Sequence, residues 1–255
     1  MSFGGRDSYT EGPADLSVAS EVCPETVRHY QAVLGKSTSR ERRKRTRTRV
    51  LGDEDRRYSF GKEWDALAIC KCKIKEGRAP ALKVTESGIT VRNWIGVTLD
   101  GYTHDGVHCQ TDGGQGWNSR RIHDIHFYRC VIPQGEDSVT LGRNFGRVTF
   151  EECIFETRRG QHDKILQLNF GDVRVRSRYF GPTKNLAEMK GNTRLVFEED
   201  HPSIAHDIRT IVQADGNDGY RTLERGDVRV DVRGLQIRGR NKEMAGKGRR
   251  LKLRR

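Results

Sequence analysis

The chain has 255 residues, of which 34% are hydrophobic, and 47 basic against 35 acidic side chains give it a formal net charge of +12. No apolar run approaches the ~20 residues that a membrane-spanning helix needs, and the N-terminus lacks the apolar core of a secretory signal. These features exclude a membrane protein and suit one domain with polar tails. A mature secreted chain and a protein released from a virus or phage share them, and we expect one of these two locations.

The first part of the chain, residues 1–57, is predicted to be an arm that carries one helix and a basic linker. Residues 1–20 show no periodicity, which is typical of a mobile segment. Apolar side chains recur at helical spacing within residues 24–34, and Gly35 follows them as a helix end. We expect this short amphipathic helix to cap an open edge of the domain that follows it.

Much of the positive charge is concentrated in two runs, residues 40–49 and residues 238–255. Like charges repel one another and stay solvated, so we predict a flexible linker and, over residues 239–255, a frayed basic tail. Basic segments attract acidic partners such as an acidic polysaccharide, a nucleic acid or a virion interior. The charge alone does not choose among these partners, and nucleic acid is not the favoured one.

The middle of the chain, residues 58–238, contains repeated strand-like segments. Residues 125–132, 148–155 and 173–180 align with one another, and their starts lie 23 and 25 residues apart (148 − 125 and 173 − 148). Apolar and polar residues alternate within each segment, which is the period of a β-strand. Repeats of this length predict a parallel β-helix, an all-β solenoid in which each coil stacks on the one before it.

Three cysteines, Cys109, Cys130 and Cys153, are separated by nearly the same interval as these segments. Free cysteine behaves as a small apolar residue. We therefore predict that the three occupy stacked, buried positions of successive coils rather than forming disulfides. The pair Cys70 and Cys72 is too closely spaced for the usual zinc site.

A second repeated phrase places an acid in front of a short apolar run, at Asp105, at Glu136 and Asp137, and at Asp163. In a solenoid such residues lie one above another, about 4.8 Å apart. A column of carboxylates needs a cation, a proton or a basic neighbour, and oxygen ligands of this kind suit Ca²⁺. Lys164 is the basic group next to the third acid. Alternatively, the acids are turn formers that bind the corner backbone.

Three of these segments together resemble the core motifs of the third family of pectate lyases. They are Asp-Gly-Val-His-Cys at residues 105–109, Gly-Glu-Asp-Ser-Val-Thr at residues 135–140 and Asp-Lys-Ile-Leu-Gln-Leu-Asn at residues 163–169. The resemblance covers roughly residues 88–200. It implies a compact right-handed parallel β-helix and a lyase that cleaves polygalacturonate by β-elimination with the help of Ca²⁺.

Residue by residue, the resemblance implies a calcium site and a basic cleft. Asp105, Glu136 and Asp137 match calcium ligands of the family, and Asp163 joins them in the predicted column. The arginine of the family has no match at its own position, and Arg178 is a nearby substitute. The predicted catalytic residues, basic groups that could remove the proton next to the substrate carboxylate, are Lys164, Lys184 and Arg178. The predicted substrate-binding residues, of which the tryptophan could stack on a sugar ring, are Arg176, His162 and Trp117.

Two other functions stay open. Paired carboxylates among Asp105, Asp137 and Asp163 would serve a glycoside hydrolase as acid and base. A β-helix with basic tails would also serve as a non-catalytic part of a viral or phage particle. Under the lyase interpretation we expect a monomer, an acidic polysaccharide as substrate and Ca²⁺ as the cofactor.

Overall fold

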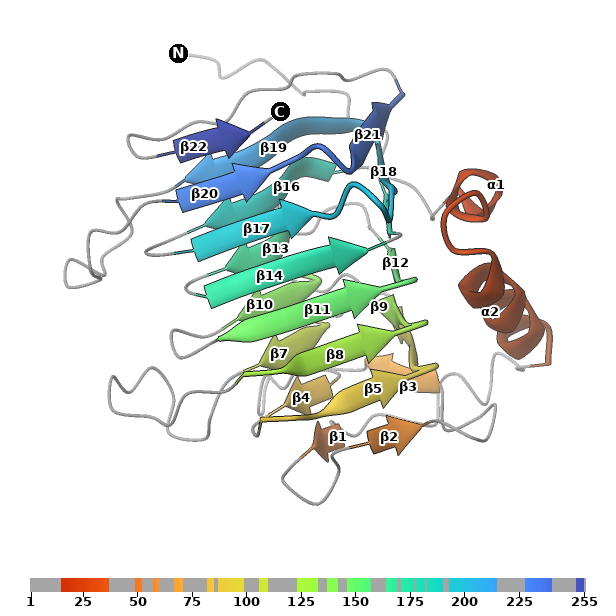
Figure 1. Cartoon of the computed structure of the whole chain (residues 1–255). Coiled ribbons are helices and arrows are strands. Elements are labelled where there is room, and N and C mark those ends of the chain that lie inside the picture. The colour runs from red at the N-terminus through yellow and green to blue at the C-terminus, as the bar shows by residue number, and fades with distance from the viewer. Residues whose placement is uncertain are drawn as a thin grey trace, which may run out of the picture.

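The computed structural model is a stack of parallel β-strands with two helices beside it (Figure 1). It describes residues 15–36, 49–51, 57–59, 67–70, 82–84, 87–98, 106–109, 123–132, 137–141, 146–156, 164–168, 171–176, 178–181, 183–189, 193–214, 228–239 and 251–254. Within these residues every pairing of strands is parallel. The predicted all-β parallel β-helix is confirmed.

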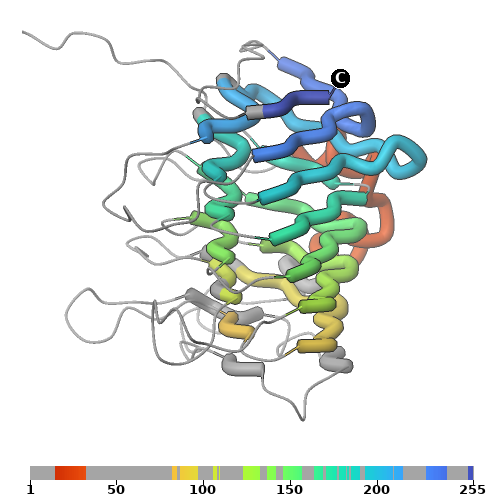
Figure 2. The backbone as a smooth tube through the Cα atoms, turned by 60° about the vertical axis from the view of Figure 1, so that its left-hand side comes forward, coloured from red at the N-terminus to blue at the C-terminus, as the bar shows by residue number. Residues whose placement is uncertain are grey.

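Three sheets form the sides of the coils, and neighbours within a sheet are, up to β20, three strands apart along the chain (Figure 2). Sheet A has seven strands: β1 (Arg49–Leu51), β4 (Leu82–Val84), β7 (Val107–Cys109), β10 (Val139–Leu141), β13 (Lys164–Leu168), β16 (Thr183–Met189) and β19 (Ile208–Ala214). Sheet B has eight: β2 (Arg57–Ser59), β5 (Thr90–Arg92), β8 (Ile125–Tyr128), β11 (Arg147–Glu151), β14 (Gly171–Arg176), β17 (Thr193–Phe197), β20 (Val228–Asp231) and β22 (Leu251–Arg254). Sheet C has seven: β3 (Leu67–Cys70), β6 (Ile95–Thr98), β9 (Val131–Ile132), β12 (Ile154–Phe155), β15 (Tyr179–Phe180), β18 (Ser203–His206) and β21 (Leu235–Arg238).

The alignment of the repeated segments is the register of sheet B. Val148 pairs with Ile125 on one side and with Val173 on the other, as the sequence repeat predicts. The side chains of all three are buried, because the apolar member of each alternating pair faces the interior. The hydrophobic pattern therefore specifies which residues stack, since a slip by one residue would turn the apolar set toward solvent.

The stack extends beyond the predicted bounds of residues 58–238. Strand β1 begins at Arg49, inside the predicted linker, and strand β22 lies inside the predicted basic tail. The prediction of a frayed tail is wrong for β22, because Leu251 and Leu253 pair with Val228 and Val230 of β20. Their alternation with basic residues suits a strand that adds to the end of a sheet.

Phenylalanine rings stack through the interior. Phe127 and Phe150, on neighbouring strands of sheet B, have ring centroids 5.1 Å apart, and Phe155 and Phe180 of sheet C repeat the arrangement at 4.8 Å. Phe150 meets Phe155 edge to face at 5.4 Å, which joins the two sheets. Aromatic pairs of this kind contribute about 0.5–1.5 kcal/mol each beyond the area that they bury.

The corner between sheets B and C has a left-handed backbone on several coils. Asn93, Arg129 and Glu152 have φ values of 56°, 53° and 48°, a region that residues other than glycine seldom occupy. Their N–H groups donate to carbonyl oxygens of the next coil at 3.0 to 3.2 Å. The inter-coil hydrogen bonds thus continue around the corner, and they compensate for the unusual conformation.

The prediction for the cysteines is confirmed in part. Cys109, Cys130 and Cys153 are buried and free, and the N–H of Cys130 donates to Sγ of Cys153 at 3.4 Å across neighbouring coils. Cys109 does not share their column, because it belongs to sheet A, where it pairs with Leu141. With three strands in a coil, a similar sequence interval can join positions on different sides of the stack.

Helices α1 (Leu16–Ala19) and α2 (Pro24–Lys36) lie along the side of the stack, next to sheet C (Figure 1). The helix predicted from residue 24 is therefore present, but it covers a side rather than an open end. The N–H of Asp15 donates to the hydroxyl of Tyr179 at 3.0 Å, and Sγ of Cys23 lies 3.5 Å from the carbonyl oxygen of Cys153. The helices lie beside a column of buried, mostly apolar residues of sheet C, which explains their position. This column consists of Val131, Ile154, Tyr179 and Ile204 on successive strands.

Candidate functional site

The second and third predicted motifs meet on neighbouring coils at the start of their strands in sheet A. Val139 pairs with Leu166, so Asp137 and Lys164, each two residues earlier, are level with one another. The predicted column had Asp163 level with Asp137. The register gives that level to Lys164 instead, because the apolar residues of the two strands, not the acids, set the pairing.

Two polar columns continue from this point along sheet A, three residues apart on each strand. The first consists of Asp137, Lys164, Asn185 and Thr210. The second consists of Thr140, Gln167, Glu188 and Gln213. We refer to these eight residues as the polar columns of sheet A. Between the two columns each strand has a buried pair, such as Ile165 and Leu166.

Side chains of the first column contact the second column on the following coil. Nζ of Lys164 lies 2.5 Å from Oε2 of Glu188. One coil further along, Nδ2 of Asn185 donates to Oε1 of Gln213 at 3.2 Å. The repeated offset shows that the two contacts are versions of one arrangement, occupied by an ion pair in one coil and by amides in the next.

The polar columns are largely shielded from solvent. The side chains of Lys164 and Glu188 are 14% and 8% exposed, and Asp137 is 2% exposed. Charges in such surroundings have lost much of their hydration, so their mutual interactions are stronger than at the surface, and each needs a partner. An amine and carboxylates held together in this way can exchange a proton or bind a charged group.

Half of the predicted site residues fall outside the described part of the chain. These are Asp105, Trp117, Glu136, His162 and Asp163. For Lys184 the structure describes the backbone, which belongs to β16 directly before Asn185. The roles predicted for these six residues stay predictions.

The predicted calcium site also lies mostly outside the described residues. Of its four predicted ligands, Asp137 alone lies among the described residues, and Lys164 is level with it. Within the described ranges, no group of three or more His, Cys, Asp or Glu side chains has an arrangement that could hold a metal ion. The described residues do not by themselves fit a Ca²⁺ site, which requires several oxygen ligands.

The catalytic role predicted for Arg178 is wrong, because its side chain is fully enclosed in the core. It follows Cys130 and Cys153 in their column, and its guanidinium lies 5.9 Å from the centre of the Phe150 ring. Desolvation lowers the pKa of Arg178 to about 10. Burial acts to raise the pKa of Cys153, but the hydrogen bond with Cys130 and the charge of Arg178 lower it overall. A guanidinium enclosed among rings and thiols cannot contact a polysaccharide.

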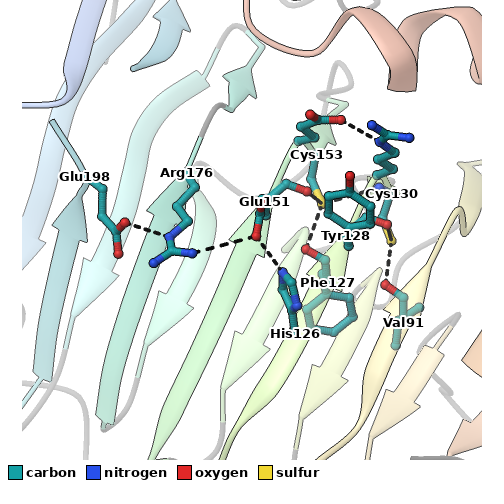
Figure 3. A network of polar contacts seen from close by, with 11 residues as sticks. Val91, His126, Phe127, Tyr128, Cys130, Glu151, Cys153, Arg176 and Glu198 are labelled. Atoms are coloured by element: carbon teal, nitrogen blue, oxygen red, sulfur yellow. Dashed lines mark hydrogen bonds and ion pairs between the residues drawn. The ribbon is translucent and has the colours of Figure 1, made fainter. Parts of the chain in front are cut away.

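Arg176, predicted to bind substrate, belongs to sheet B and is not brought together with Lys164. Its Nε donates to Glu198 at 2.6 Å, and its guanidinium lies 3.9 Å from Glu151 (Figure 3). Glu151 also contacts Nε2 of His126 at 3.0 Å. Desolvation lowers the pKa of His126, and the charge of Glu151 opposes this in part. The result is a His–Glu–Arg–Glu chain across four coils.

Sequence reasoning did not single out Glu188, Glu151 or Glu198. A usable signal was present for each. Glu188 stands three residues after Asn185, as Gln167 stands three after Lys164. Glu151 and Glu198 are level with Arg176, one coil before it and one coil after it. Opposite charges one coil apart therefore predict contacts once the coil length is known.

Comparison with known proteins leaves the function to be argued from the residues. No protein-family model, no curated protein and no solved structure matches the chain. Neither of the two described helices has the length and hydropathy of a membrane span.

Proposed function

We propose that the protein is a polysaccharide lyase that cleaves polygalacturonate or a related acidic glycan by β-elimination at the polar columns of sheet A. The observation that carries the proposal is the level placement of Asp137 and Lys164 on neighbouring coils, with Glu188 beside the amine. The three motifs that resemble those of pectate lyases support the same function. The parallel β-helix is compatible with it.

The elimination requires a base that removes the C5 proton next to the uronate carboxylate. The electron pair of the C5–H bond forms a double bond between C4 and C5, the bond from C4 to the bridging oxygen breaks, and that oxygen takes up a proton from water. Lys164 is the proposed base, and it acts after its ammonium group has given a proton to solvent. Glu188, 2.5 Å away, would stabilise the ammonium that forms. Lys184, on the next coil, is the proposed partner of the substrate carboxylate.

Calcium remains part of the proposal as a requirement to be tested. A bound Ca²⁺ would neutralise the uronate carboxylate and so make the neighbouring proton more acidic. Three of its four proposed ligands, Asp105, Glu136 and Asp163, lie outside the described residues.

The test is release of unsaturated product from polygalacturonate and from other uronate polymers, followed by ultraviolet absorbance with added Ca²⁺ or with a chelator. We expect Lys164→Ala to lower the rate at least 100-fold, since general-base catalysis contributes on the order of 10²–10⁴-fold. We expect Glu188→Gln to have a smaller effect. Arg147→Ala, which removes an exposed cation from sheet B, is the matched control and should retain the wild-type rate.

Other results would overturn the proposal in distinct ways. Saturated reducing ends, formed without absorbance and without Ca²⁺, would identify a glycoside hydrolase with paired carboxylates. No product of either kind from any acidic polymer would favour a non-catalytic β-helix. Unchanged lyase activity in Lys164→Ala would show that the active site does not lie on sheet A.

A further inference from the structure

Three thiols surround the buried guanidinium of Arg178. Cys153 and Cys130 lie in the same column of the stack, one coil and two coils before it. Cys23, which lies between helices α1 and α2, reaches the same region from the helical side, and its Sγ is 3.5 Å from the carbonyl oxygen of Cys153. All four residues are fully buried. The core therefore contains a cation and three ionisable sulfurs at a place that the polar columns do not reach.

The guanidinium of Arg178 lacks a hydrogen-bonded counter-charge. Within the described part of the chain, none of its three nitrogens makes a hydrogen bond, and a buried cation in this state is costly unless a negative charge lies nearby. The carboxylate of Glu151 already contacts His126 and Arg176 on sheet B. Apart from desolvation, the group that acts most strongly on the pKa of Arg178 is Cys153. A thiolate at Cys153 is the counter-charge that these surroundings offer.

Cys109 shows what burial does to a thiol without a guanidinium beside it. Cys109 and Cys153 are equally buried. Burial raises the pKa of Cys109. Burial also acts to raise the pKa of Cys153, but the hydrogen bond with Cys130 and the charge of Arg178 more than offset it. Since the thiolate is the reactive form of cysteine, Cys153 is the more nucleophilic of these two sulfurs.

Cys130 is placed to react with Cys153. Its N–H donates to Sγ of Cys153 at 3.4 Å. The two thiols repeat one arrangement, because Sγ of Cys130 lies 3.5 Å from the carbonyl oxygen of Val91 and Sγ of Cys153 lies 3.6 Å from that of Phe127 (Figure 3). Neighbouring strands are about 4.8 Å apart, and disulfides join residues whose Cα atoms are about 4.4–6.8 Å apart. A disulfide between these two coils therefore needs no movement of the backbone.

We propose that Cys153 and Cys130 form a site of oxidation that reacts with hydrogen peroxide. The sulfur of Cys153 attacks one peroxide oxygen, the O–O bond breaks, and the departing hydroxide takes up a proton from solvent. Cys153 is thereby oxidised to a sulfenic acid, and the peroxide is reduced. The sulfur of Cys130 then attacks that of Cys153, and the hydroxyl leaves as water with the thiol proton of Cys130. In total, two thiols and one peroxide give one disulfide and two waters.

Arg178 is a positioning residue in this reaction, because it holds the charge on Cys153 and takes no part in bond making. Peroxide is a small molecule, and it reaches the sulfurs through the local opening that folded chains undergo. The site is independent of the proposed lyase reaction, since no step of the elimination uses these residues.

The test treats the reduced full chain with hydrogen peroxide, alkylates the remaining thiols after unfolding and locates linked cysteines by peptide mass spectrometry. We expect a link between Cys130 and Cys153, while Cys109, the equally buried control, stays alkylated. In Cys130→Ala the sulfenic acid of Cys153 should persist and react with dimedone. Arg178→Met, which keeps an unbranched side chain in the core but removes the charge, should slow the oxidation at least about tenfold.

A second measurement needs no variant and separates the charge on Cys153 from a merely structural role of Arg178. The rate of oxidation between about pH 6 and 8 should rise less steeply with pH in the folded chain than in the chain unfolded by urea, where Cys153 is an ordinary thiol. The ionisable groups that act on Cys153 in the fold are Cys130, Arg178 and Glu151, and Glu151 opposes the other two.

Four results would overturn the inference. Oxidation of Cys109 as fast as Cys153 would show that the reaction follows unfolding. A link between another pair of cysteines would show that the column does not direct it. An equal pH dependence in the folded and unfolded chains would remove the thiolate, as would an unchanged rate in Arg178→Met with its fold verified by circular dichroism. No reaction of the folded chain would exclude the site.

Discussion

The polar columns of sheet A and the outer face of sheet B are built in the same way, with one residue per coil in each column. They differ in the number of their charged side chains and in how far these are exposed to solvent. The polar columns of sheet A contain few charges and shield them, as the exposed fractions of 14% and 8% for the side chains of Lys164 and Glu188 show. Sheet B is dense in charge and open to solvent, with exposed Arg194, Arg229 and Lys252. A charge in the polar columns has to be paired, whereas solvent screens the charges of sheet B and makes each of them less dependent on its partner.

The largest expected difference between the two faces comes from breaking the ion pair of sheet A. Lys164→Ala should lower the free energy of unfolding by about 3 kcal/mol, because it leaves the shielded carboxylate of Glu188 without its ammonium. Urea unfolding followed by circular dichroism measures this. The double variant Lys164→Met/Glu188→Leu should recover much of the loss, since it removes both charges. A loss below 1 kcal/mol for Lys164→Ala would contradict the shielded character of this face.

The matching experiment on sheet B concerns Arg176 and Glu198, whose side chains are 35% and 18% exposed. A double-mutant cycle with Arg176→Gln and Glu198→Gln should give a coupling energy of about 0.5–1 kcal/mol, because solvent screens the pair. The coupling should shrink as salt is added. A coupling energy as large as that of the pair in sheet A, and insensitive to salt, would erase the contrast between the faces.

His126 in sheet B makes the stability of the fold depend on pH. Its pKa in the folded chain lies below the value of 6.5 expected in the unfolded chain, chiefly because of desolvation. The folded chain then binds fewer protons than the unfolded chain between these two pKa values, so stability should fall as the pH drops through 6.5 toward the folded value. His126→Gln should flatten this part of the profile. Free energies of unfolding at about pH 5 to 8 test this, and parallel profiles for the two proteins would contradict it.

The smallest effect is expected in the column of sheet B that holds Arg194, Arg229 and Lys252 on three successive strands. Arg229→Glu places an acid between Arg194 and Lys252, and it should raise the free energy of unfolding by about 0.3 kcal/mol at low salt. Added salt should remove the gain, because it screens the charges of this column. Arg229→Gln should give about half the gain. Thermal unfolding at two salt concentrations is the measurement, and destabilisation by Arg229→Glu would show that the column is not under strain.

The fold was predictable from the sequence because the buried side chains of a solenoid alternate with a period of two residues along each strand. The same pattern recurs once in every coil. Ile125, Val148 and Val173 were aligned correctly, and the structure pairs them. The types of residue at the candidate site were predictable, but the residues that lie at the same height on neighbouring coils were not. Aligning acids put Asp163 next to Asp137, whereas the buried residues of the strands decide the pairing and bring Lys164 to that place.

The parallel β-helix and the stacking of its apolar residues follow from the amino-acid pattern alone, because burial of one face leaves a single acceptable register. The folded arrangement was needed to show which polar residues share a side of the stack. It placed Arg178 inside the core, Arg176 on sheet B and Lys164 beside Glu188. The physical reason is that three sheets turn away from one another at corners, so neighbours along the chain face different directions. Residues a full coil apart, by contrast, come into contact.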